Sequence, residues 1–345
     1  MRRCWIVAVW LCLALIAGVS AAGADETLDG EEFTEEEGEQ AKDEREFGTT
    51  QNTFEVPDAG TDVVGSVKTV PVPSGDTLLD IARRHGLGYQ EIRRANPDMD
   101  MWIPEPGQSV TIPTRFILPP GPREGVVVNL PEMRLYYYPE PGPNGRRVVK
   151  TYPISTGRMD WSTPVGDTQV TTRLENPAWF PPPSVRERAE EQGQTLPRRV
   201  EPGPDNPLGD YAIGLDISGY FIHGTNKPAG VGMRASSGCI RMYPEDIEEL
   251  VHAVRRGMPV RILDEPIKAG LSRDGRVFLQ SYPPLDESQD APSDARRLAV
   301  EAVAEALQNR SARVDYKRLQ EAARDAAGRP VDISREGGGE LAQGH

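Results

Sequence analysis

The sequence has 345 residues, with 39 Lys and Arg against 53 Asp and Glu, which gives a formal net charge of −14. This length exceeds one ordinary domain, so we expect two folded units with linkers. The acidic balance argues against a nucleic-acid partner, because phosphate contacts need a concentrated basic face. The 32 prolines and 34 glycines, with 6% aromatic residues, favour a loop-rich, mainly β architecture.

Residues 1–24 have the pattern of a cleaved signal peptide. Arg2 and Arg3 precede an apolar run from Cys4 to Val19, and Ala22-Gly23-Ala24 offers a cleavage site. The alternative is an uncleaved anchor, but the run falls short of the roughly 20 apolar residues that span a bilayer. We therefore predict export through the membrane.

The acidic segment 25–66 that follows carries many carboxylates and little apolar content. Such a composition cannot bury a core, so we expect residues 25–66 to be a disordered spacer.

A small unit is predicted over residues 67–114. Residues 69–72 favour a strand, and a turn at 74–77 precedes a helix capped by Asp76 or Thr77. A second helix over 89–95 ends at Asn96-Pro97, and residues 109–113 return as a strand. The order is β-α-α-β.

This unit resembles a LysM domain. The resemblance rests on Gly75-Asp76-Thr77-Leu78, Asn96-Pro97 and Pro106-Gly107-Gln108, and it implies binding to the glycan strands of peptidoglycan. A purely structural module is the alternative, since Val70 and Leu79 replace aromatic residues that are common in the family.

A larger β domain is predicted over residues 123–264. We interpret it as a β sandwich or partial barrel with one packed helix at 245–256, which Gly257 ends. The expected strands cover 126–130, 133–138, 147–154, 166–174, 219–223 and 258–263.

The rest of the chain changes character beyond Leu285. We take residues 265–285 as a C-terminal extension that follows the β domain, and residues 286–345 as a tail. One or two amphipathic helices are predicted over 295–327, and disorder over 328–345.

The candidate catalytic residues are one cysteine and one histidine. Signal cleavage removes Cys4 and Cys12, so Cys239 remains as a single exported thiol, which indicates reactivity. A cysteine nucleophile needs a base, and His223 lies 16 residues earlier, with glycines between them that let the chain fold back.

Neighbouring residues fit the same interpretation. Gly238 permits a tight turn whose N–H groups, with that of Cys239, can face an oxyanion. Arg241 projects to the same side of an extended chain as Cys239, where it can hold a carboxylate or favour a thiolate. A buried structural cysteine is the alternative. A zinc site is a poor alternative, because one Cys and one nearby His fall short of the three or four protein ligands that zinc requires.

These motifs resemble those of the YkuD-type L,D-transpeptidases, in their ErfK/YbiS-like periplasmic branch. The resemblance is carried by four segments, namely Thr163-Pro164-Val165-Gly166, His223-Gly224-Thr225-Asn226, Ser236-Ser237-Gly238-Cys239-Ile240-Arg241-Met242 and the extension from Pro266. It implies the YkuD β-sandwich fold with Cys239 and His223 as the catalytic pair. It also implies orientation of His223 by the Gly224 carbonyl, an oxyanion environment from Ser236, Ser237, Gly238 and Cys239, and a structural or carboxylate contact from Arg241.

The resemblance further implies a reaction. Cys239 attacks the peptidoglycan tetrapeptide stem at diaminopimelate, D-alanine leaves, and an amine resolves the thioester without metal or cofactor. A diaminopimelate amine would give a 3–3 cross-link, and a lysine of an outer-membrane lipoprotein would tether the wall in the Gram-negative periplasm. The alternatives are an L,D-carboxypeptidase of the same fold and a non-catalytic wall-binding protein.

Overall fold

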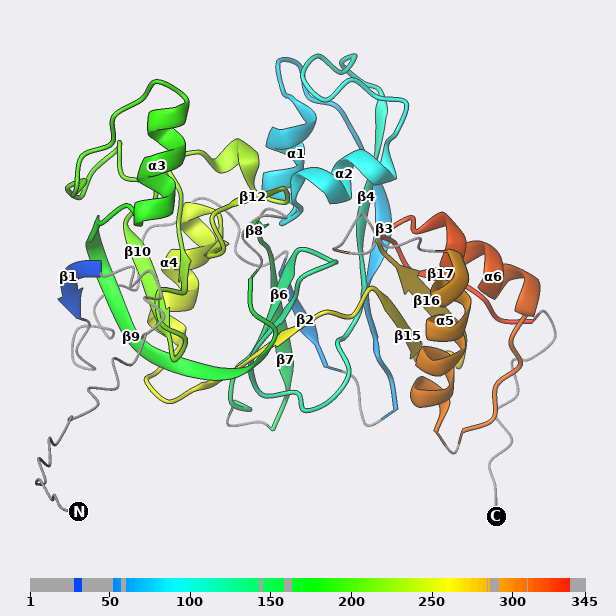
Figure 1. Ribbon diagram of the computed structural model, residues 1–345. Coiled ribbons are helices and arrows are strands. Elements are labelled where there is room, and N and C mark those ends of the chain that lie inside the picture. The colour runs from blue at the N-terminus through cyan, green and yellow to red at the C-terminus, as the bar shows by residue number, and fades with distance from the viewer. Residues whose placement is uncertain are drawn as a thin grey trace, which may run out of the picture.

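The computed structural model describes residues 28–32, 52–56, 60–142, 145–157, 163–283, 285, 292–308 and 310–335 (Figure 1). The predicted signal peptide lies outside these residues. Three units lie side by side: the LysM-like unit, the large β domain and a C-terminal unit. One buried cluster lies within the large domain, a second joins that domain to the LysM-like unit, and a third lies in the C-terminal unit. The predicted mainly β fold class is confirmed.

The first unit has the predicted β-α-α-β order. Strands β3 (Val63–Pro71) and β4 (Ser109–Ile117) pair along their whole length and flank helices α1 (Leu78–Arg84) and α2 (Tyr89–Ala95). Thr77 caps α1, because its hydroxyl accepts from the Asp80 N–H at 3.1 Å and the Asp80 carboxylate accepts from the Thr77 N–H at 2.8 Å.

The large domain is built on one extensive sheet. Its strand order is β13-β11-β10-β9-β14-β5-β6-β7-β2, and β1 pairs with β9. Two pairs in it are parallel, β14 with β5 and β11 with β13. The bounds are β1 Leu28–Glu32, β2 Thr53–Glu55, β5 Gly125–Asn129, β6 Arg134–Tyr138, β7 Val148–Pro153, β9 Gly166–Trp179, β10 Tyr211–Leu215, β11 Phe221–His223, β13 Ile240–Arg241 and β14 Pro259–Leu263.

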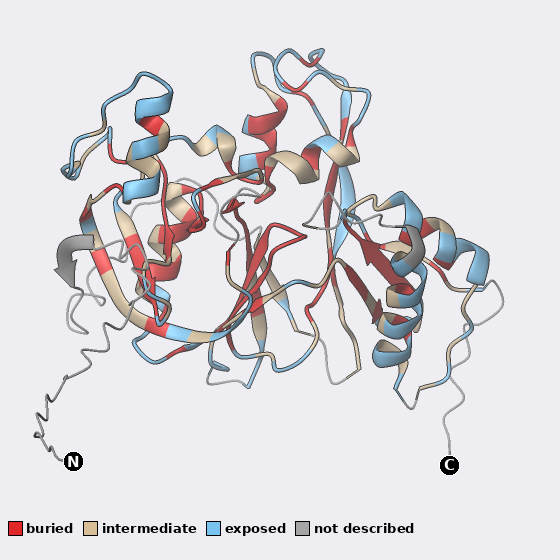
Figure 2. Cartoon of the chain, in the orientation of Figure 1, coloured by how far each residue is buried: buried red, intermediate tan, exposed pale blue. Residues whose placement is uncertain are grey.

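Both faces of this sheet are covered near its centre. Val126 and Val128 pack with helix α4 (Pro244–Ala253) in one buried cluster, whereas Val127 and Tyr136 face the LysM-like unit in another. Successive residues of a strand point to opposite faces, which explains why β5 is apolar at every position. Figure 2 shows this burial concentrated in the central strands.

A second helix stands in the large domain, beyond the one that was predicted. Helix α3 (Pro183–Glu191) begins with a proline in its first turn and buries only Ala189 among its residues. The sequence of α3 has no apolar stripe. The helix therefore has no face to bury, and it projects from the domain (Figure 1).

The expectation of a wholly disordered spacer over 25–66 was wrong where the structure describes it. Strand β1 pairs with β9, β2 pairs with β7, and β3 already begins at Val63. Phe54 explains part of this order, since its ring packs edge-on against Phe116 with centroids 5.8 Å apart. Sheet edges recruit these segments through backbone hydrogen bonds, which need no apolar composition.

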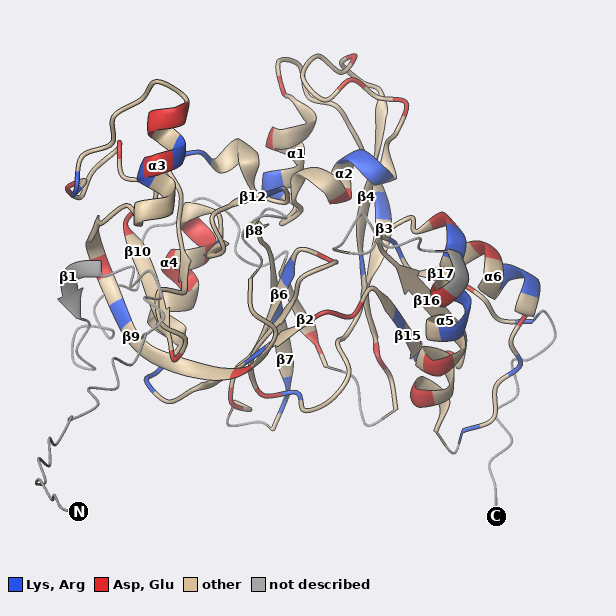
Figure 3. Ribbon diagram, in the orientation of Figure 1, with Lys and Arg blue, Asp and Glu red and all other residues tan. Residues whose placement is uncertain are grey.

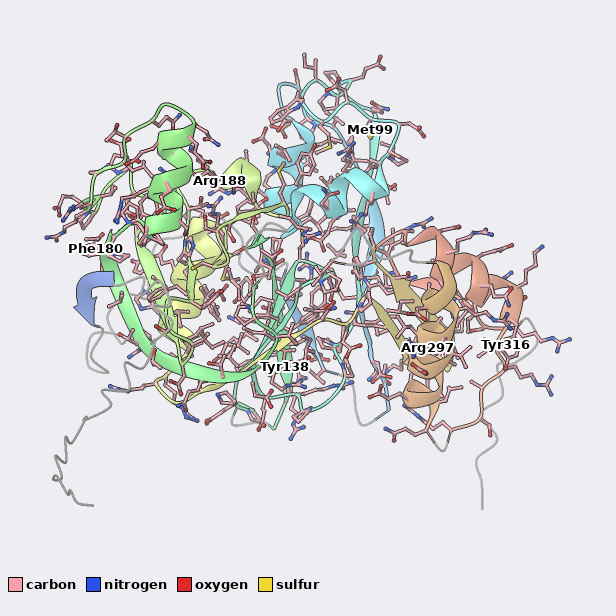
Figure 4. All side chains as sticks on the ribbon, in the orientation of Figure 1. Met99, Tyr138, Phe180, Arg188, Arg297 and Tyr316 are labelled. Atoms are coloured by element: carbon pink, nitrogen blue, oxygen red, sulfur yellow. The ribbon has the colours of Figure 1, made fainter. Side chains whose placement is uncertain are left out.

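The C-terminal unit is a small sheet covered by two helices. Strands β15 (Ile267–Leu271), β16 (Val277–Ser281) and β17 (Val331–Asp332) pack against α5 (Pro292–Leu307) and α6 (Tyr316–Asp325). Charged residues are frequent on both helices (Figure 3), and Arg297 and Tyr316 lie exposed on their outer side (Figure 4).

The prediction of disorder from residue 328 onward was wrong for residues 328–335. Ile333 is fully buried among the helices, and β17 extends the sheet. Residues 336–345 lie outside the described part of the chain.

Candidate active site

His223 and Cys239 are brought together by two parallel strands. Ile222 on β11 is the register partner of Ile240 on β13, and both isoleucines point into the core. The residues before and after them therefore point to the opposite face of the sheet. His223 and Cys239 share that face, and both are buried, at 4% and 6% exposure.

His223 is oriented by its own neighbour. Its Nδ1 lies 2.7 Å from the Gly224 carbonyl oxygen. A carbonyl only accepts hydrogen bonds, so Nδ1 carries the proton in this contact and Nε2 is left as the basic nitrogen. The contact has the geometry that the resemblance implied for Gly224.

The electrostatics keep this imidazole neutral. Burial, followed by the charge of Arg241, lowers the pKa of His223 to about 3, and the carbonyls of Gly224 and Leu208 act in the opposite direction. The histidine is therefore an unprotonated base over the whole neutral range. A neutral imidazole beside a thiol can take up the thiol proton as the sulfur attacks.

The turn before Cys239 is held by two hydroxyl groups. The Ser236 hydroxyl donates to the Cys239 carbonyl and accepts the Gly238 N–H at 3.3 Å. The Thr163 hydroxyl donates to the Gly238 carbonyl at 2.7 Å. Gly238 has φ of +111°, which favours glycine at this position.

These contacts modify the predicted roles. The Gly238 N–H was expected to face an oxyanion, but in this structure it points to the Ser236 hydroxyl. Ser237 is exposed beside the turn. Thr163 was missed as a site residue, although its Thr-Pro-x-Gly motif was noted and supplied the signal.

Arg241 and the thiol complete the site. The backbone of Arg241 exchanges two hydrogen bonds with Ser155, at 2.8 and 3.0 Å, which fixes β13 against the chain after β7. Cys239 Sγ lies 3.6 Å from the Gly219 carbonyl oxygen, a contact in which the S–H donates. The cysteine forms no disulfide.

Within the described ranges, no group of three or more His, Cys, Asp and Glu side chains is arranged to hold a metal ion. None of the helices in those ranges has the length and apolar character needed to cross a membrane.

Known proteins resemble this chain over most of its length. The profile of the L,D-transpeptidase catalytic domain, YkuD, matches residues 123–262, and that of the LysM domain matches residues 72–113. The chain is 38% identical to the probable L,D-transpeptidase YcfS of Escherichia coli K12, over 82% of this chain and 89% of that protein. It is 39% identical to the probable L,D-transpeptidase ErfK/SrfK of the same strain, over 82% and 91%.

Among solved structures, L,D-transpeptidase 3 of Mycobacterium tuberculosis matches 59% of this chain and 93% of its own, at 19% identity and a TM-score of 0.30. The identities to the Escherichia coli proteins decide the assignment. The chain belongs to the L,D-transpeptidase family of enzymes and joins a YkuD catalytic domain to a LysM domain.

Proposed function

We propose that the protein is a periplasmic L,D-transpeptidase that acts on peptidoglycan tetrapeptide stems through a thioester at Cys239. The single observation that carries this proposal is the parallel pairing of β11 with β13, because His223 at the end of β11 and Cys239 directly before β13 lie on the same face of the sheet. The signal-peptide pattern and the kinship with cell-wall enzymes support the location.

The proposed donor half-reaction uses Cys239 as the nucleophile and His223 as the base. Cys239 Sγ attacks the carbonyl of the L-centre of diaminopimelate while His223 Nε2 accepts the thiol proton. The tetrahedral intermediate collapses when the bond to D-alanine breaks and His223 returns the proton to the leaving amine. The product is a thioester between Cys239 and the stem, with free D-alanine.

An amine then resolves the thioester. It loses a proton to His223 as it attacks, and Cys239 leaves as the thiol. A diaminopimelate amine gives a 3–3 cross-link, the lysine of an outer-membrane lipoprotein gives wall attachment, and water gives carboxypeptidase activity. We assign transpeptidation as the main reaction, with the carboxypeptidase as the second candidate.

Mass spectrometry of the mature protein with disaccharide-tetrapeptide, with and without an acceptor amine, tests the proposal. We expect dimers or acceptor adducts that vanish in Cys239→Ala. Tripeptide alone would support the carboxypeptidase. Release of D-alanine by Cys239→Ala would overturn the nucleophile assignment, and no reaction of the wild type with any acceptor would overturn the proposed function.

A further inference from the structure

The loop that joins the base to the nucleophile touches the LysM domain. This loop covers residues 224–238. The Tyr89 N–H, at the start of α2, donates to the Val231 carbonyl at 2.9 Å, and the Gln90 N–H faces the Gly232 carbonyl at 3.4 Å. Val231 is fully buried in this contact.

Two glycines allow the backbones to come this close. A Cβ built on Gly88 would lie 2.7 Å from the Gly232 Cα, and one built on Gly232 would lie 2.3 Å from the Tyr89 nitrogen. Real Cβ atoms do not come this close to other atoms. The loop therefore requires a glycine at position 88, and the start of α2 requires one at position 232. We call the contact of residues 88–90 with residues 231–232 the α2–loop contact.

The LysM side of the α2–loop contact is held in place by an ion pair between Glu91 and Arg134. The Glu91 carboxylate accepts the Gly88 N–H at 2.8 Å and receives two bonds from Arg134, at 2.8 and 2.6 Å. Arg134 lies on β6, is fully buried, and also donates to the Gly86 carbonyl at 2.9 Å. A bidentate buried ion pair of this kind holds both partners in one geometry.

The loop is also connected to the active site through Ser155. The Ser155 hydroxyl donates to the Gly230 carbonyl at 2.8 Å, while the Ser155 backbone pairs with Arg241 beside Cys239. A displacement at Val231 therefore acts on the segment that orients the thiol.

We propose that the LysM domain is a positioning element of the active site, and that the α2–loop contact sets the orientation of Cys239 toward His223. The LysM domain then contributes to the chemical step through residues that do not touch the substrate. The catalytic part of this proposal rests on the proposed function, whereas the reactivity of the thiol does not.

The test uses the full-length mature protein and the variant Gly88→Ala. This change adds a methyl group on the LysM side, at a φ of −92° that strains no backbone. Two glycine-to-alanine controls meet no atom within 4 Å: Gly107→Ala at a φ of +83° in the LysM domain, outside the contact, and Gly257→Ala at a φ of +79° in the large domain. Each variant is measured for kcat and KM of D-alanine release, for the rate of Cys239 alkylation by iodoacetamide, and for thermal unfolding.

We expect Gly88→Ala to lower kcat and the alkylation rate by roughly 10- to 100-fold with KM within twofold, because small misplacements of reacting groups have effects of that size. The two controls should stay within twofold of the wild type. Rates for Gly88→Ala that equal those of the controls would overturn the proposal. A kcat that falls only in proportion to the unfolded fraction would overturn it as well.

A second pair of variants tests the same contact in case Gly88→Ala does not fold. Tyr89→Pro removes the N–H that bonds Val231 at the first position of a helix, where proline is well tolerated, and Tyr89→Ala removes the side chain alone. Slower alkylation in Tyr89→Pro than in Tyr89→Ala supports the contact, and equal rates refute it. If the wild type released no D-alanine while alkylation still depended on the contact, the proposed function would fail and the positioning would stand.

Discussion

The depressed pKa of His223 makes the stability of the fold depend on pH in a defined direction. The ordinary histidine pKa of 6.5 applies to the unfolded chain, whereas burial and Arg241 lower the folded value to about 3. Below pH 6.5 the unfolded chain therefore binds a proton that the folded chain does not. The stability contributed by neutral His223 is fully present above pH 6.5 and is lost as the pH falls toward 3.

The size of the effect follows from linkage. Each pH unit in this window costs about 1.4 kcal/mol, so this group alone lowers the free energy of unfolding by about 2.7 kcal/mol between pH 8 and pH 4.5. Carboxyl groups titrate in the same range, so the relevant quantity is the difference in slope between the wild type and His223→Gln.

Urea unfolding at intervals from pH 8 to pH 4.5 measures both slopes, and NMR titration of the imidazole signals measures the midpoint directly. We expect His223→Gln to lose the extra slope and the His223 signal to stay unprotonated to pH 4.5. A His223 midpoint near 6.5, or identical slopes for the two proteins, would refute the reasoning. The same neutral base predicts that kcat/KM does not fall between pH 7 and pH 5 through protonation of His223.

Three further substitutions have outcomes that the contacts determine. Lys268→Met should lower the free energy of unfolding by about 3–5 kcal/mol, because it leaves the buried Glu132 carboxylate without the cation that lies 2.7 Å away. The double variant Lys268→Met with Glu132→Gln should recover part of that loss, as measured by urea titration. Thr163→Val should reduce kcat about tenfold by removing the donor to the buried Gly238 carbonyl, whereas Thr163→Ser should retain the rate of D-alanine release. Arg83→Met should cost about 1 kcal/mol or less, since its ion pair with α4 is partly exposed, and a loss above 2 kcal/mol in salt-dependent unfolding would contradict this.

Local patterns in the sequence were sufficient to predict the helices of the LysM domain and to single out His223 and Cys239 as candidate site residues. The helices α1 and α2 follow from apolar spacing and from the Thr77 cap, which act within a few residues. The chemistry of a thiol and a nearby base left a buried structural cysteine as the alternative, and the resemblance to the L,D-transpeptidases favoured His223 and Cys239 as the predicted pair. These inferences required no knowledge of distant contacts.

Features that depend on distant contacts were not predicted. Strand β2 lies in the segment that was expected to be a disordered spacer, and it is ordered by the edge of a sheet, where Thr53 pairs with Lys150, 97 residues away in the sequence. Helix α3 lacks an apolar stripe, so its sequence gives no helical period. The direction of the Gly238 N–H depends on the Ser236 rotamer, which sequence does not encode in any local pattern.

One pattern in the sequence indicates that a further unit docks on the catalytic sheet. A strand that is apolar at every position, such as Val126-Val127-Val128, indicates that both faces of its sheet are covered. The predicted sandwich accounts for one face, and the LysM domain covers the other.

A buried polar cluster shows why the three units are not independent of one another. Glu132, in the turn before β6, accepts hydrogen bonds from Lys268 and Tyr282 of the C-terminal unit, at 2.7 and 3.1 Å, and from Tyr136 of the catalytic sheet, at 2.7 Å. The Lys268 ammonium also donates to the Ile117 carbonyl at the end of the LysM domain. Separating any unit from the others would leave buried charges and hydroxyl groups without partners, which is costly. A glycan held by this LysM domain would therefore sit at a set position relative to Cys239, since the same buried contacts that stabilise the fold join the two sites.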